Sequence, residues 1–178
     1  GTLLEESSYK NGLLDGTYKI YYINGNLKIL GSYKNNFKDG LETNYYEDGL
    51  SKKSETSYID GKKAGVEKLY FRNGNISQES LYVNNMLNGE EKNYYENGNI
   101  KEIHEYINNI ENGIAKLYYE NGVLRWTVPV KNGMANGAGY LYHSNGLLEE
   151  EGNYKNDLED GIFKSYSDSG TLISTFNY

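Results

Sequence analysis

The chain has 178 residues, of which 24% are charged and 37% hydrophobic, and its formal net charge is −7. That balance argues against nucleic acid and anionic membrane surfaces as partners, because both attract clusters of Lys and Arg. The chain contains no Cys, which excludes disulfides and Cys-ligated zinc, whereas its 20 Tyr and 21 Gly are typical of a folded sheet with half-buried faces.

Glycines recur along the chain with a period of about 24 residues, which indicates a repeat protein. One series precedes expected strands, and the other lies in expected turns. The first series is Gly16, Gly40, Gly65, Gly89, Gly113, Gly137 and Gly161. The second series is Gly1, Gly25, Gly49, Gly74, Gly98, Gly122, Gly146 and Gly170.

Tyrosines follow the same period at three positions of the repeat. Five residues after each first-series glycine stand Tyr21, Tyr45, Tyr70, Tyr94, Tyr118, Tyr142 and Tyr166. The next residue is Tyr22, Tyr46, Phe71, Tyr95, Tyr119, His143 or Ser167. A closing position holds Tyr9, Tyr33, Tyr58, Tyr82, Tyr106, Val130, Tyr154 and Tyr178.

Turn signals arrive about every 12 residues, beginning with Asn11-Gly12 and Asn24-Gly25, and the two kinds of turn then alternate to Ser169-Gly170. The segments between turns are too short for helices and suit strands. After a first strand before Asn11, the expected strands are 13–23, 26–34, 37–47, 50–59, 62–72, 75–83, 86–96, 99–107, 110–120, 123–131, 134–144, 147–155, 158–168 and 171–178.

The predicted fold is therefore all-β: an elongated single-layer antiparallel β-meander of about seven 24-residue hairpin repeats. Residues 1–178 are expected to form a single repeat array, with a partial unit over 1–15 and full units beginning near the seven glycines of the first series. We expect the repeat tyrosines Tyr45, Tyr70, Tyr94 and Tyr118 to be more buried than Tyr18 and Tyr140, which lie outside the repeat positions.

The first hairpin illustrates the expected register. Asn-Gly favours a two-residue type I′ turn at Asn24-Gly25, because both central residues need a positive φ. Tyr22 would then oppose Leu27, and Tyr33 would lie over Gly16. Alternate segments differ by two residues in length, and a β-bulge at Asp15-Gly16 and its counterparts would absorb the excess.

This pattern resembles the MORN repeat, in the bacterial variant found in YwqK-like antitoxins. The matching residues run from Asp39-Gly40 through Tyr45-Tyr46-Glu47-Asp48-Gly49 to the closing Tyr58, and the resemblance covers essentially the whole chain. It implies a structural and binding module whose partner is left open.

Catalytic and cofactor motifs are not found. His104 and His143 occupy different repeat positions, and the sequence contains neither a GxSxG nucleophile motif nor a phosphate-binding loop. The acidic run Glu149–Glu151 is read as a solvated strand face rather than a glycosidase pair. We therefore expect no enzyme activity, no catalytic residue, no bound metal and no cofactor.

A tyrosine-lined face is the candidate binding surface. Its residues are Tyr21, Tyr45, Tyr70, Tyr94, Tyr118, Tyr142 and the single Trp126. The leading hypothesis is a scaffold that binds a protein partner, in an antitoxin- or immunity-like role favoured by the resemblance and the acidic charge. The alternatives are a cell-surface adhesin or glycan binder, favoured by the tyrosines, and a phospholipid-associated module, disfavoured by the net charge of −7.

The final strand also invites association. Residues 171–178 carry no side-chain charge and are rich in β-forming residues, so we expect residues 172–178 to pair with a second copy, a further segment of the protein or a partner protein. Cellular location is left open between the cell surface, secretion and the cytoplasm.

Overall fold

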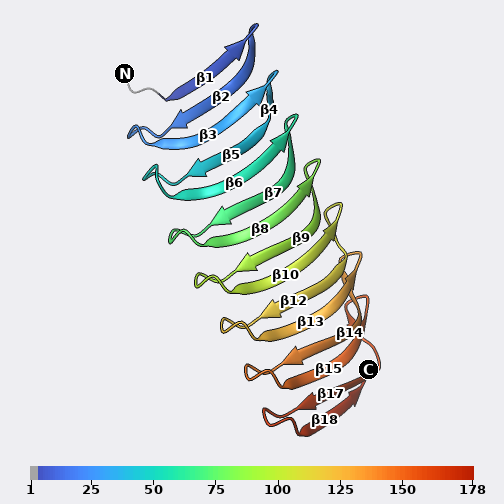
Figure 1. The fold of residues 1–178 in the computed structure, drawn as a ribbon. Coiled ribbons are helices and arrows are strands. Elements are labelled where there is room, and N and C mark those ends of the chain that lie inside the picture. The colour runs from blue at the N-terminus through green and yellow to red at the C-terminus, as the bar shows by residue number, and fades with distance from the viewer. Residues whose placement is uncertain (1–3) are drawn as a thin grey trace. The chain divides into compact units, whose positions relative to one another are not determined.

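The computed structural model describes residues 4–178 and places 18 strands and no helix there (Figure 1). The chain divides into two compact units, the first ending at Met86 and the second spanning Leu87–Tyr178. Within each unit, strands pair antiparallel with their neighbours in sequence. The predicted all-β meander of hairpin repeats is confirmed.

The strands of unit 1 are β1 (Glu5–Lys10), β2 (Leu13–Tyr21), β3 (Leu27–Lys34), β4 (Phe37–Lys38), β5 (Gly40–Tyr45), β6 (Lys52–Ile59), β7 (Lys62–Tyr70) and β8 (Ile76–Val83). β9 (Met86–Tyr94) begins at the boundary. The remaining strands of unit 2 are β10 (Ile100–Ile107), β11 (Ile110–Glu111), β12 (Gly113–Tyr118), β13 (Leu124–Lys131), β14 (Met134–Tyr142), β15 (Leu148–Lys155), β16 (Leu158–Glu159), β17 (Ile162–Tyr166) and β18 (Leu172–Asn177).

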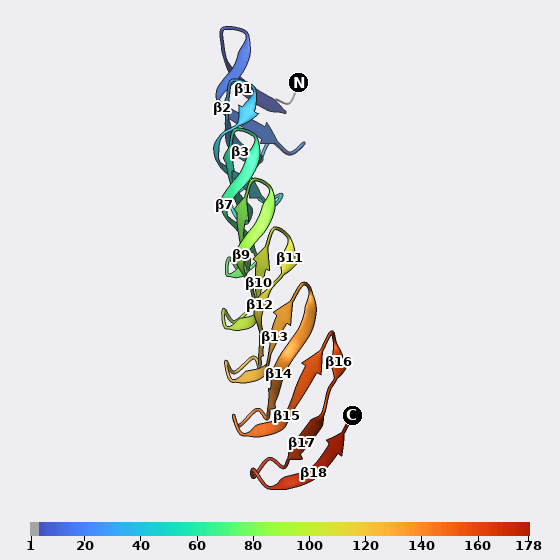
Figure 2. The ribbon, with the colours of Figure 1, turned by 90° about the vertical axis from the view of Figure 1, so that its right-hand side faces the viewer.

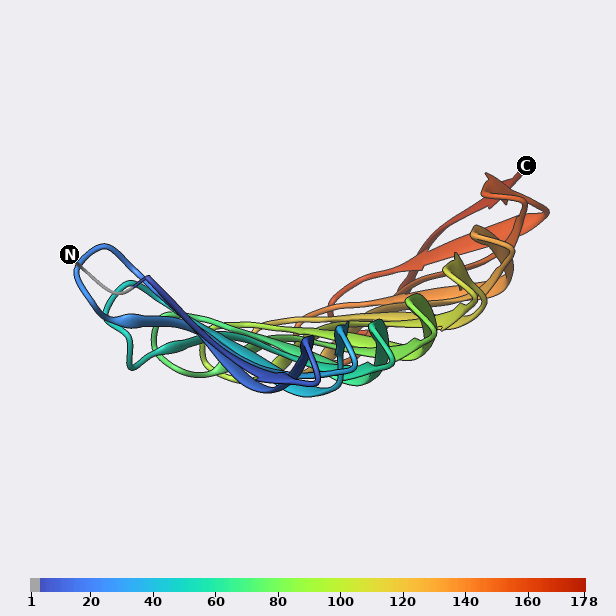
Figure 3. The same cartoon turned by 90° about the horizontal axis from the view of Figure 1, so that it is seen from above.

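Each unit is a single layer over the described range. The turned views in Figures 2 and 3 show strands alone, with neither a helix nor a second sheet laid over them. Side chains on the two faces of that layer must therefore supply the whole core.

The predicted pairing of the closing tyrosines with the first-series glycines is confirmed. Gly16 pairs with Tyr33 and Gly113 with Val130, and the last such pair, Gly161 and Tyr178, exchanges both backbone hydrogen bonds. The rings, however, do not cover these glycines. A Cβ built on Gly16 would meet only Ser8 within 4 Å.

The predicted bulges are also present. Gly16 has a φ of 109°, and the β1–β2 register shifts where Ser8 faces the segment Asp15–Thr17. In three of the longer segments the bulge divides the segment into two strands. These pairs of strands are β4 and β5, β11 and β12, and β16 and β17. This explains why 18 strands occupy the 14 or 15 predicted segments.

The prediction of a two-residue type I′ turn at Asn24-Gly25 was wrong. Only Gly25 has a positive φ there, and the Gly25 amide donates to the Tyr22 carbonyl while the Tyr22 amide donates to the Asn26 carbonyl. The loop thus has three residues, a type I turn followed by a left-handed glycine. As a result, Leu27 pairs with Tyr21 instead of Tyr22.

Two-residue turns with both residues at positive φ occur in the alternate series. Asn35 and Asn36 have φ values of 48° and 70°, and Asn11-Gly12 has 52° and 80°. Asn tolerates this conformation better than most residues, so Asn-Asn replaces Asn-Gly without changing the turn.

Most of the buried residues lie on one face of the sheet, which we call the core face. It carries the residue two positions after each first-series glycine, such as Tyr18 after Gly16, together with the residue paired with it on the neighbouring strand. Apart from the buried Gly31 and Gly139, its buried members are Tyr18, Glu42, Thr56, Ser80, Ala115, Val128, Val130 and Phe163.

The expectation for Tyr18 was wrong, since it is only 4% exposed. Its ring lies over its cross-strand partner Gly31, where an added Cβ would approach the ring to 2.6 Å. The four repeat tyrosines expected to be better buried are half-buried.

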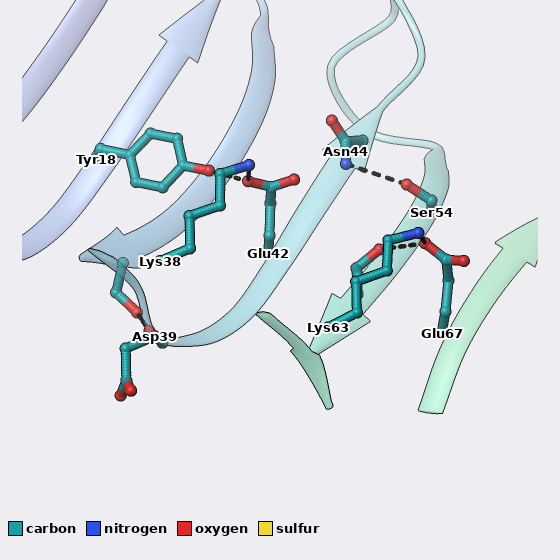
Figure 4. A network of polar contacts seen from close by, with 10 residues as sticks. Tyr18, Lys38, Asp39, Glu42, Asn44, Ser54, Lys63 and Glu67 are labelled. Carbon is teal, nitrogen blue, oxygen red and sulfur yellow. Dashed lines mark hydrogen bonds and ion pairs between the residues drawn. The ribbon is translucent and has the colours of Figure 1, made fainter. Parts of the chain in front are cut away.

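In unit 1 the core face is held by polar groups (Figure 4). The Tyr18 hydroxyl donates to the Glu42 carboxylate, and the Lys38 ammonium pairs with the same carboxylate. In the next repeat, Lys63 Nζ lies 2.7 Å from Glu67 Oε1, which also accepts from the Thr56 hydroxyl at 2.9 Å. Each of these two carboxylates therefore has a cation and a hydroxyl as partners, which offset the cost of removing its charge from water.

In unit 2 the core face becomes apolar toward the C-terminal end. Val128 is fully buried beside Ala115 and Val130. Further along, Tyr154 and Phe163 meet edge to face with ring centroids 5.4 Å apart. The Phe163 ring lies over Gly152 as the Tyr18 ring lies over Gly31.

Where the residue after the Tyr21 position is Tyr or His, it links one repeat to the next, whereas Phe71 at this position has no hydroxyl to donate. Tyr22, Tyr95 and Tyr119 each donate a hydroxyl hydrogen bond, at 2.8–2.9 Å, to the carbonyl 23 residues further on. His143 replaces this tyrosine and makes the same contact, from Nε2 to the Tyr166 carbonyl at 3.0 Å. His143 thus serves as a linking residue in the repeat.

Candidate functional site

The face opposite the core face holds the predicted tyrosine column, and we call it the ladder face. It carries Tyr21, Tyr45, Tyr70, Tyr94, Tyr118, Tyr142 and Tyr166, which alternate along their strands with the core-face residues. Every one of these tyrosines is half-buried. The structure therefore places the predicted tyrosines on a common face within each unit.

Charged side chains fix several of these tyrosines from the neighbouring strand. The Tyr166 hydroxyl donates to Glu151 Oε1 at 2.8 Å, and Lys164 Nζ lies 3.1 Å from the same oxygen. These two contacts lower the pKa of the Glu151 carboxyl, and the bond to Glu151 raises that of the Tyr166 hydroxyl.

The same arrangement occurs in unit 1. The Tyr70 hydroxyl donates to the Glu55 carboxylate, which also pairs with Lys52. Burial opposes ionisation of Glu55, but the bonds from Lys52 and Tyr70 outweigh it, and the pKa of Glu55 is lowered. The pKa of Tyr70 is raised, first by burial and then by the bond to Glu55.

An exposed apolar column runs beside the tyrosines on the ladder face. It occupies the position after the first-series glycines, where Thr17 and Glu90 are the polar exceptions, and its large members are Leu41, Val66, Ile114 and Ile162. Ile162 is 59% exposed. This column was not predicted, although its position recurs with the same 24-residue period as the tyrosines.

The column is interrupted by a small residue in unit 2, where a hollow of about 290 Å³ opens. The column position holds Ala138 there, between Ile114 and Ile162 in sequence. The hollow is lined by Ala138, Tyr140, Glu151, Asn153, Ile162 and Lys164. It combines an aromatic wall with the Lys164–Glu151 pair.

Tyr140 stands where most other repeats carry lysine. The corresponding residues are Lys19, Thr43, Lys68, Lys92, Lys116 and Lys164. Tyr140 is 36% exposed, so its ring is available at the surface of the ladder face.

Trp126 does not join the tyrosine column. It pairs with Leu117 and Leu141 and packs against the buried Ala115, Val128 and Val130 of the core face. The predicted surface thus divides: the tyrosines lie on the ladder face, and the indole contributes to the core of unit 2. A lone Trp among polar counterparts gave no signal that distinguishes these two environments.

The histidines have different surroundings. His104 Nδ1 lies 2.6 Å from Glu111 Oε1, and its Nε2 lies 3.9 Å from Glu102. His143 Nδ1 lies 3.5 Å from Glu149 while Nε2 contacts the repeat-linking carbonyl. Within residues 4–178, no three His, Asp or Glu side chains form a group suited to a metal ion. The described chain also holds no helix long and apolar enough to cross a membrane.

Comparison with protein families matches the repeats to the family described as MORN repeat variant. The matched segments are 14–35, 63–84, 87–108, 111–132, 135–156 and 159–178. They cover well over half of the chain, which therefore belongs to the MORN repeat variant family. A search of curated proteins finds no match.

The unmatched repeat contains the one added residue of the array. Its turn closes with the Tyr46 amide on the Ser51 carbonyl, one residue later than in the first hairpin. Leu50 is 86% exposed in this longer turn, and the Asp48 carboxylate accepts from the amides of Leu50 and Ser51 at 2.8 Å each. These bonds lower the pKa of Asp48.

Proposed function

We propose that this member of the MORN repeat variant family is a non-enzymatic scaffold that binds a protein partner on its ladder face. The observation that carries the proposal is the exposed apolar column beside the half-buried tyrosines. Large apolar side chains at a regular spacing on one sheet face cost solubility, and such patches mark protein interaction sites. An antitoxin- or immunity-like role is the specific form that the resemblance of the repeats favours.

The chemistry of the face supports a protein partner over a glycan. Sugar rings stack on open aromatic faces, whereas the ladder tyrosines are half-buried. The hydroxyls of Tyr70 and Tyr166 are also engaged by glutamates. The exposed groups are instead aliphatic, as at Leu41, Val66 and Ile162, and these bury well against protein side chains.

The test is capture of proteins from the native host on the immobilised chain and on face variants. Val66→Asp in unit 1 and Ile162→Asp in unit 2 place charge on the ladder face. Ile23→Asp and Leu50→Asp are matched controls, because both residues are large, apolar and more exposed, but lie in turns.

We expect a specific partner to be retained by the parent and both turn variants, and to be reduced at least tenfold on one or both face variants. Equal retention by all four variants would overturn the proposed use of the ladder face.

A further inference from the structure

One lysine on the ladder face of unit 2 differs from its counterparts. Lys19, Lys68, Lys92 and Lys164 each lie within 4 Å of a carboxylate, namely that of Glu6, Glu79, Glu90 and Glu151 respectively. The Lys116 ammonium makes no ion pair or hydrogen bond within the described part of the chain, although its backbone is paired in the sheet. Its cross-strand neighbours are Ile103 and Thr127, which carry no charge.

Apolar residues flank Lys116 on β12, and the nearby Glu105 carboxylate accepts from the Ile114 amide at 3.4 Å instead of pairing with this lysine. Ile114 precedes it on the same face of β12 and is exposed, and Ile114 pairs with Pro129 of β13. Lys116 is half-buried as a residue, and its ammonium has no ion-pair partner among the described residues. A partner carboxylate placed there would therefore form a charge-assisted contact with no ion pair to break first.

The Ala138 hollow lies in register with this lysine. Lys116 pairs with Thr127, and Thr127 pairs with Tyr140, so the ammonium and the aromatic wall belong to one cross-strand row. Two strand spacings separate them, roughly 10 Å. In a polyproline II segment, residues three apart lie on the same side about 9 Å from each other.

We propose that the ladder face of unit 2 from β12 to β17 binds an extended peptide with one apolar side chain in the Ala138 hollow and one carboxylate at Lys116. The apolar side chain contacts Tyr140 and Ile162, and the peptide crosses the strands. This inference rests on the proposed function and names the partner chemistry of the same face.

The peptide carries a single acid and not an acidic run. The chain has a net charge of −7, so further carboxylates would be repelled. The second cation of the patch, Lys164, is already paired with Glu151 at 3.1 Å and offers no equal site. This part of the ladder face therefore selects a peptide by the spacing between its one acidic residue and its one apolar residue.

Two variants test the two contacts proposed for the peptide. Ala138→Ile fills the hollow with the residue found at positions 114 and 162, and Lys116→Glu reverses the free charge. Lys68→Glu is the matched control, since it changes the same repeat position in unit 1. Thermal melts establish that each variant is folded.

The probe is a displayed library of random 12-residue peptides, selected on the full 178-residue chain. We expect enriched peptides to carry Asp or Glu three residues from Leu, Ile, Met or Phe. Fluorescence anisotropy with a selected peptide should show Kd raised at least tenfold by Ala138→Ile and by Lys116→Glu, and less than twofold by Lys68→Glu.

Enrichment of peptides without this spacing, or binding unchanged by Ala138→Ile and Lys116→Glu, would overturn the inference. Loss of binding on Val66→Asp alone would also overturn it, while leaving the proposed function of the ladder face intact. Failure of the proposed function is read separately, from host-protein capture on the face and turn variants.

Discussion

The hydroxyl of Tyr119 donates a 2.9 Å hydrogen bond to the carbonyl oxygen of Tyr142, which lies one repeat further along the chain. The same bond is made by Tyr95 to the Tyr118 carbonyl and, through an imidazole, by His143 to the Tyr166 carbonyl. In these repeats the second aromatic residue therefore links neighbouring repeats through the polar group at the end of its ring, a role that Phe71 at the same position cannot fill.

Removing one of these hydroxyls should weaken the linkage without opening a cavity. Tyr119→Phe leaves the Tyr142 carbonyl without its donor, and we expect the free energy of unfolding to fall by about 0.5–1.5 kcal/mol. Urea denaturation measures the change. Tyr9→Phe is the control, because Tyr9 is exposed and has no such bond; equal losses in both variants would remove the linkage account.

Gly31 should tolerate no side chain beneath the Tyr18 ring. An added Cβ would lie 2.6 Å from that ring, so Gly31→Ala should cost about 1–3 kcal/mol, as overpacking does. The decisive measurement is a double-mutant cycle with Tyr18→Ala. We expect Gly31→Ala to cost much less once the ring is gone, whereas an undiminished cost would show that the ring is not what excludes the methyl group.

Gly31 also shows what could be predicted from the sequence. Once Gly16 is paired with Tyr33, counting along the strands places Tyr18 opposite Gly31, a glycine outside both periodic series. The register from Gly16–Tyr33 to Ile20–Ile29 was predicted correctly from turn spacing and the glycine period, and only the pairing beside the turn was wrong. The burial of Tyr18 was not predicted, because it depends on the single glycine opposite its ring, Gly31, and not on a feature that recurs in every repeat.

The turn at Asn24-Gly25 was mispredicted for a related reason. Asn-Gly fits both a two-residue type I′ turn and the last two residues of a three-residue loop. Pairing of the flanking strands decides between them, and dipeptide preference does not. Likewise, the position of Trp126 on the core face follows from neighbours such as Val128, which a residue-by-residue comparison of repeats does not reveal.

Alkaline pH should destabilise unit 1 through Tyr18 and Tyr70. Burial and a glutamate partner raise the pKa of both hydroxyls above the ordinary value of 10.0. A raised folded-state pKa gives stability that is complete below the unfolded-state pKa near 10 and is lost as pH rises through the folded-state pKa. We therefore expect stability to decline above about pH 10.

Tyrosinate absorbance follows this directly. In the parent, the last tyrosines to ionise should do so together with unfolding, and a Tyr18→Phe, Tyr70→Phe double variant should show a smaller absorbance step there. A double variant with the same step as the parent would contradict the assignment to these two hydroxyls.

Self-association through β18 is a further proposal. Leu172, Ile173 and Phe176 are exposed on this strand, which pairs with β17. We expect the 178-residue chain to form a concentration-dependent dimer in size-exclusion chromatography with light scattering, and Ile173→Lys to shift it toward the monomer, because charge on an edge strand opposes pairing. A parent chain that is monomeric at all concentrations would leave this proposal without support.

Site-specific photo-crosslinking in the native host tests the central claim most directly. A photoreactive phenylalanine analogue is placed at Val66 or Ile162 on the ladder face, and at Ile23 or Leu50 in the turns as controls. If the ladder face is the binding surface, Val66 or Ile162 yields a discrete crosslinked protein and the turn positions do not. Crosslinks confined to Ile23 and Leu50 would contradict the account.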